Sequence, residues 1–83
     1  MYYLIMCRSL TYAQRVSRGL ERAGITARVL RTPAEISPSG CGYSVKLAAR
    51  HLTRALTILK ELNLPYTGVY VHGAEYGYRE VEL

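Results

Sequence analysis

The stretch "YSVKLAARHLTRALTILKEL", residues 43–62, decides the fold because it joins two different hydrophobic periods. Apolar and polar residues alternate over residues 43–47, which predicts a half-buried strand with Ser44 and Lys46 on the face away from the core. The spacing then changes to that of an amphipathic helix, whose apolar stripe consists of Leu52, Ala55, Leu56, Leu59 and Leu62. We therefore expect a helix that packs on one face of a sheet.

Strand and helix patterns also precede this stretch. The apolar run "YYLIMC", residues 2–7, predicts a buried first strand. Residues 11–23 carry apolar side chains at helical spacing, with arginines on the opposite side. Ser9 or Thr11 is a suitable cap for the start of this helix, and Gly24 is a suitable residue to end it.

Two further strands complete the pattern, over residues 25–31 and 67–72. Residues 32–42 are rich in proline, serine and glycine and are expected to form a loop. The order strand, helix, strand, strand, helix, strand predicts an α+β protein with the ferredoxin-like βαββαβ fold. In this fold a four-stranded antiparallel sheet carries both helices on one face.

The whole chain, residues 1–83, is expected to form a single ferredoxin-like domain with its core in residues 2–72. Residues 73–83 form a C-terminal extension that contains a possible short strand, "YREVEL". Such a strand either frays or pairs with a sheet edge, in the same chain or in a second copy. A homodimer through the extension is therefore one possible assembly.

Composition limits the class of protein. The chain has 11 Lys and Arg residues against 6 acidic residues, and its net charge of +5 either is a solvated basic surface, which is the commoner case, or attracts nucleic acid, an acidic protein surface or a small anion. Two cysteines are too few for a disulfide scaffold, and the apolar runs are too short to span a membrane. We expect a cytoplasmic protein with reduced thiols and no membrane partner.

The most unusual local feature is Cys41, which stands between Gly40 and Gly42 in the loop. Glycine neighbours allow backbone amides to approach the sulfur closely. In the expected fold, this loop lies at the same end of the sheet as the end of the first strand and the start of the first helix. A helix N-terminus and nearby cations favour a thiolate, so Cys41 is predicted to be the reactive residue of the chain.

Groups around Cys41 could support that role. The loop residues Ser37, Ser39, Gly40 and Gly42 offer hydroxyls and amides, and Arg8 and Lys46 could add positive charge. Cys7 ends an apolar strand, which favours core packing; the alternative is a thiol that resolves Cys41. The chain has no Cys-x-x-Cys pair, no His/Cys metal spacing, no paired carboxylates and no Gly-x-Gly-x-x-Gly motif. No metal, cofactor or enzymatic acid–base chemistry is therefore expected.

The sequence resembles the Se/S carrier protein-like family of small bacterial proteins, from about Tyr2 to Tyr70. The most specific part of the resemblance consists of Pro33, Ile36, Ser37, Ser39, Cys41 and Gly42. The resemblance implies that Cys41 carries sulfur or selenium as a persulfide or selenosulfide. It also implies a donor protein such as a cysteine desulfurase, an acceptor protein, and a carrier role rather than an enzymatic one.

Two other classes of function remain open. An RNA-recognition motif has the same element order, and "SGCGYSVKL" overlaps its third-strand motif in part. However, Tyr43 is expected to face the helices, which leaves Tyr70 as a poor stacking platform. A small ligand-binding or oligomerisation module on the same fold would not need Cys41.

Overall fold

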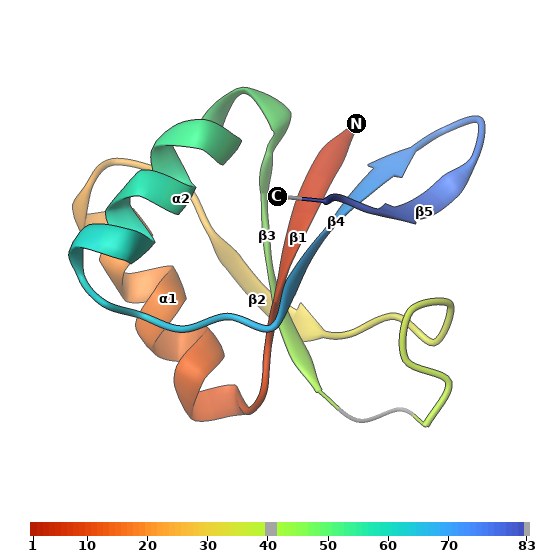
Figure 1. Ribbon diagram of the computed structural model, residues 1–83, viewed down its shortest axis with the longest axis horizontal. Coiled ribbons are helices and arrows are strands. Elements are labelled where there is room, and N and C mark those ends of the chain that lie inside the picture. Colours follow the sequence, from red (N-terminus) through yellow and green to blue (C-terminus); the bar gives the residue numbers. More distant parts are fainter. Residues whose placement is uncertain (40–41, 83) are drawn as a thin grey trace.

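The computed structural model describes residues 1–39 and 42–82, and these form two helices and a five-stranded antiparallel sheet (Figure 1). The order of neighbouring strands is β2-β3-β1-β4-β5, and every pairing is antiparallel. The elements, in chain order, are β1 (Tyr2–Cys7), α1 (Leu10–Arg22), β2 (Arg28–Arg31), β3 (Tyr43–Ala48), a 3-10 turn (Ala49–His51), α2 (Leu52–Glu61), β4 (Gly68–Gly73) and β5 (Gly77–Glu80).

The sheet differs from the expected one by a strand. The order of the first four strands is consistent with a ferredoxin-like arrangement, but the prediction of four strands was wrong because β5 pairs with β4. The C-terminal extension thus pairs with an edge of its own sheet, with Tyr70 opposite Glu80 and His72 opposite Tyr78. Beyond β5, the Val81 amide donates a hydrogen bond to the Val69 carbonyl at 2.8 Å.

Both helices lie on one face of the sheet, as expected, and the main core lies between the two layers (Figure 1). Tyr43 packs against this core, as predicted from its alternation with the apolar residues of β3. The fully buried core side chains from both layers include Ile5, Val16, Leu20, Val45, Leu59 and Val69.

The two helices end in the same way. After α1, the Ile25 amide donates to the Leu20 carbonyl at 2.9 Å, and Gly24 adopts a φ of 84°. This is the hydrogen-bond pattern of a Schellman motif, in which a left-handed residue ends the helix. Asn63, with a φ of 56°, occupies the equivalent position after α2. At the start of α1 the cap is Ser9, whose Oγ accepts a hydrogen bond from the Tyr12 amide at 3.3 Å.

The start of β2 and the side chain of Leu62 differ most from the sequence prediction. β2 begins at Arg28 rather than at residue 25. The intervening backbone is already bonded to α1, because the Ser17 hydroxyl donates to the Ala27 carbonyl at 2.7 Å. Leu62 was expected in the buried stripe of the second helix, but it lies beyond α2 and is 52% exposed. Its amide still donates to the Ile58 carbonyl at 2.9 Å, and its side chain lies beside Gly19 at the edge of the contact between α1 and α2.

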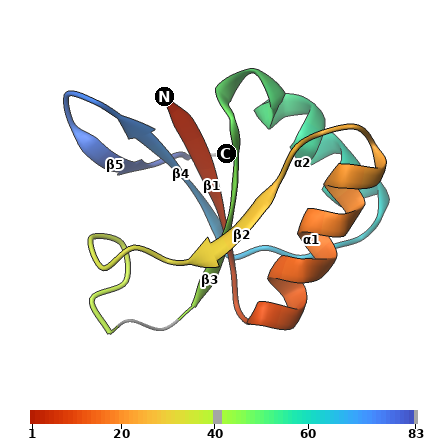
Figure 2. The ribbon, with the colours of Figure 1, turned by 180° about the vertical axis from the view of Figure 1, so that it is seen from behind.

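The face of the sheet opposite the helices is covered in part by the loop between β2 and β3 and by β5 (Figure 2). Leu4 points to this face and is nevertheless fully buried. Ser44 was expected to lie away from the core, and it is also fully buried, because it meets the buried Thr32 at the start of the loop. Alternation therefore predicted the direction of Ser44 correctly, but not its burial.

Candidate functional site

The loop that carries the predicted site is closed at its base by three contacts. Arg31 and Tyr43 are paired across β2 and β3. Next along the chain, the Thr32 amide donates to the Gly42 carbonyl at 3.1 Å. The hydroxyls of Thr32 and Ser44 are hydrogen-bonded at 2.7 Å. These contacts therefore fix the backbone at the two ends of the loop.

Gly42 has a conformation that explains the choice of glycine at this position. Its φ is 101°, in a region that residues with a side chain rarely adopt. A β-carbon placed there would lie 3.5 Å from Oγ1 of Thr32. Gly42, which follows Cys41 in the sequence, thus has a left-handed backbone conformation, and its carbonyl is fixed by the hydrogen bond from the Thr32 amide.

The first half of the loop has internal hydrogen bonds of its own. The carbonyl of Pro33 accepts hydrogen bonds from the amides of Ile36 at 3.0 Å and Ser37 at 2.9 Å. The hydroxyl oxygens of Ser37 and Ser39 lie 3.3 Å apart. The two serines that were predicted to support the site are therefore brought together.

Cys7 lies at the same end of the sheet but inside the core. It is paired with Tyr43, is 3% exposed and directs its thiol toward the Ile5 carbonyl at 3.8 Å. Burial raises the pKa of the Cys7 thiol from 9.0 to about 11. The prediction that Cys7 packs in the core is confirmed, and such a thiol is a weak nucleophile at neutral pH.

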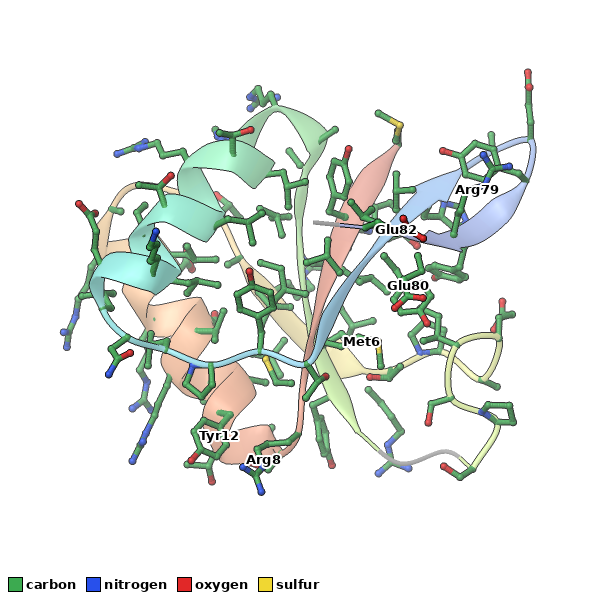
Figure 3. All side chains as sticks on the ribbon, in the orientation of Figure 1. Met6, Arg8, Tyr12, Arg79, Glu80 and Glu82 are labelled. Carbon is green, nitrogen blue, oxygen red and sulfur yellow. The ribbon has the colours of Figure 1, made fainter. Side chains whose placement is uncertain are left out.

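Two arginines give this end of the sheet a positive charge. Arg8 follows Cys7, and its guanidinium carbon lies 5.7 Å from the centre of the Tyr12 ring (Figure 3). The guanidinium carbon of Arg31 lies 5.9 Å from the Tyr43 ring. Both distances are within the range of a cation–π contact. Arg31 was missed by the sequence analysis, although its position as the last residue before the loop could have indicated it.

Lys46 lies elsewhere on the sheet. It is paired with Leu4 and Arg28, and its ammonium group lies 4.2 Å from the centre of the Tyr2 ring. Tyr2 is at the opposite end of β1 from Cys7. The Lys46 side chain is thus directed away from the loop base, toward the far end of the sheet.

Gly40 and Cys41 lie outside the described residues. The predicted proximity of Cys41 to Cys7 and Arg8, the support of its charge by Arg8 or Lys46, and a pairing of the two cysteines therefore stay predictions. Within residues 1–39 and 42–82, no group of three His, Cys or Glu side chains is placed to hold a metal ion. In the same part of the chain, no helix is both long enough and apolar enough to cross a membrane.

A comparison with models of known protein families shows to which family the chain belongs. The model of the family described as "Putative Se/S carrier protein-like" matches residues 2–71, which is most of the chain, and the protein belongs to this family. The match ends within β4, so β5 lies outside it. Comparisons with curated proteins and with solved structures gave no match.

Proposed function

We propose that this protein is a non-enzymatic carrier that holds sulfur or selenium on Cys41, as a persulfide or a selenosulfide. The observation that carries this proposal is the burial of Cys7 in a chain that belongs to a Se/S carrier-like family and has only two cysteines. A carrier thiol must enter the active site of another protein. Cys7 is unsuited to that task, which leaves Cys41 as the cargo site.

The proposed transfer is a thiol exchange without net oxidation. The thiolate of Cys41 attacks the outer sulfur of a donor persulfide, and a new sulfur–sulfur bond forms at Cys41. The bond between that sulfur and the donor cysteine breaks, and the donor cysteine leaves as a thiolate. Delivery repeats the exchange: an acceptor thiolate takes the outer sulfur and releases Cys41 as a thiolate. A selenium atom would follow the same route as the outer atom of a selenosulfide.

The described surroundings of the loop support this chemistry. Arg8 and Arg31 are exposed cations at the end of the sheet to which the loop is attached, and positive charge favours a thiolate and a persulfide anion. The hydroxyls of Ser37 and Ser39 are donors of the kind that a terminal sulfur anion accepts. The transfer requires no acid–base pair in the carrier.

The sheet face itself is a poor platform for RNA. Tyr70 points to the face opposite the helices, where its neighbours on the adjoining strands are Leu4 and Glu80. Burial is the main cause that raises the pKa of Tyr78 on the same face to about 12, and the hydrogen bond with Tyr2 and the negative charge of Glu35 in the loop add to this shift. Carboxylates at these positions would repel a phosphate backbone. The described residues therefore favour the carrier over the nucleic-acid alternative.

The test is the mass of the intact protein after incubation with a cysteine desulfurase and cysteine. The native chain and Cys7→Ala should each gain one sulfur atom, and the gain should disappear on treatment with a reductant. Cys41→Ser should gain none and should keep the native amide spectrum. Loading of Cys41→Ser to the native extent, or absence of loading in the native chain with several desulfurases, would contradict the proposal.

A further inference from the structure

A basic hollow lies at the end of the sheet opposite the loop base. Its volume is about 430 Å³, which is within the range of small-molecule sites. It is formed where β1 begins and β3 ends, near the N-terminus at the upper end of the sheet in Figure 1. Four of the nine residues that line it carry nitrogen donors in their side chains, and these are Arg28, Lys46, Arg50 and His51. None of the nine is acidic.

Two of these cations are held side by side by the sheet. Arg28 and Lys46 are directly opposite each other on β2 and β3, and both are exposed. Side chains at such positions have β-carbons about 5 Å apart, and like charges there destabilise the pair. The strand register therefore holds two positive charges close together, and a bound anion would reduce their mutual repulsion.

Most of these donors have no partner among the residues that the structure describes. Among residues 1–39 and 42–82, the side chains of Arg28, Arg50 and His51 make no hydrogen bond, ion pair or ring contact. In the same part of the chain, the one such interaction of Lys46 is with the ring of Tyr2. Elsewhere in the molecule, Arg8, Arg31 and Arg79 each lie over a tyrosine ring. The hollow thus gathers donors whose hydrogen-bonding capacity is unused.

We propose that this hollow binds a small phosphate monoester, a molecule with one phosphate dianion and a compact apolar group. Two arginines and a lysine suit a dianion, because a guanidinium binds phosphate oxygens in a bidentate manner. The apolar lining from Met1 and Ala48 suits the organic part. The proposal is independent of the carrier function, since none of these residues belongs to the loop that contains Cys41.

A concave site of this size favours a small molecule over a macromolecule. A nucleic acid or an acidic protein segment would require an extended basic surface. The neighbouring part of the same sheet face instead carries the aromatic cluster of Tyr2, His72 and Tyr78, in which the Tyr2 and His72 rings are stacked with centroids 4.7 Å apart. Both faces of the Tyr2 ring are occupied, by His72 and by Lys46, so this ring is not available for base stacking.

The test is a titration of the full chain with phenyl phosphate, followed by amide NMR. We expect saturable shifts confined to the residues around the hollow, weaker binding of inorganic phosphate, and no binding of phenol. Arg28→Gln and Lys46→Gln should each weaken phenyl phosphate binding about tenfold, the typical effect of losing one charge-assisted hydrogen bond. Arg18→Gln is the matched control, because it removes one exposed positive charge on α1 and should change the affinity less than twofold.

Three results would overturn the proposal. The first is an equal loss of affinity in Arg18→Gln, which would indicate attraction to the net charge only. The second is the absence of saturable shifts with phenyl phosphate in low salt, while all variants keep the native amide spectrum. The third is binding of a single-stranded oligonucleotide or an acidic peptide to the same residues at least a hundredfold more tightly than phenyl phosphate, which would assign the hollow to a macromolecule.

Discussion

The two ends of the sheet use polar side chains in opposite ways. At the loop end, the polar groups bind one another: Thr32 bonds to Ser44 and to the Gly42 backbone, and Arg31 lies over Tyr43. At the other end, among the described residues, Arg28 and its neighbours in the basic hollow have donors without partners. The first arrangement holds a loop in position, and the second leaves binding capacity for a ligand. Substitutions at the two ends should therefore have different signatures.

The largest effect is expected at alkaline pH and depends on Cys7. Its pKa is about 11 in the folded protein and 9.0 when solvated, so the unfolded chain loses this proton first as the pH rises. The stabilisation that comes from the protonated Cys7 thiol is fully present below pH 9. The free energy of unfolding then falls between pH 9 and 11, by up to about 2.7 kcal/mol for a difference of two pKa units. Urea unfolding across this range should show the decline.

Cys7→Ala is the control for this measurement, because it removes the thiol and leaves every other titratable group in place. The variant should be less stable at neutral pH, since it loses a buried sulfur, but its stability should decline less steeply above pH 9. Identical pH profiles for the two proteins would show that the Cys7 thiol is not shielded from water.

The next largest effect concerns the backbone at Gly42. Gly42→Ala places a side chain at a φ of 101° and should cost about 2 kcal/mol of unfolding free energy, with slower sulfur loading. Gly68→Ala is the matched control: Gly68 also lies at this end of the sheet, and an added β-carbon there has no neighbour within 4 Å. Equal stability of the two variants would contradict the role given to the loop base.

A smaller effect is expected from the buried hydroxyl pair. Thr32→Val leaves the Ser44 hydroxyl buried without its partner and should cost roughly 1.5 kcal/mol. In a double-mutant cycle, adding Ser44→Ala should recover part of this loss. Additive losses in the double variant would indicate that the two hydroxyls act independently.

The smallest effect should have the opposite sign and should occur at the hollow. Arg28→Gln removes one of two opposed cations, so the free protein should become more stable by about 0.2–0.5 kcal/mol at low salt. Added salt should reduce this gain. The corresponding change at the loop end, Arg31→Gln, removes a cation–π contact with Tyr43 and should be neutral or destabilising. A loss of stability in Arg28→Gln would mean that its charge already has a partner in the fold.

The sequence was informative where hydrophobic periodicity and capping residues agree. β1, α1 and most of α2 could be predicted because a buried face gives a regular spacing, and Ser9 and Gly24 mark the ends of α1. Periodicity does not show what lies over the second face of a sheet, so the burial of Ser44 was missed and the pairing of β5 was left open.

The two candidate sites also differ in how far they could be predicted from the sequence. Cys41 was predicted because its glycine neighbours and the family motif are local in the sequence. The basic hollow was not predicted, because Arg28 and Lys46 become neighbours only through the register of β2 and β3. Lys46 was therefore considered as a support for Cys41, whereas the structure directs it to the ring of Tyr2.

The central claim is that the two cysteines have different tasks. The most direct test is to load the native protein with a cysteine desulfurase and cysteine, trap persulfides with an alkylating reagent under native conditions, and map the modified peptides. The account predicts that the trapped sulfur is found on the peptide that contains Cys41, with Cys7 unmodified until the protein is unfolded. Sulfur trapped on Cys7, or equal modification of both cysteines in the folded protein, would contradict it.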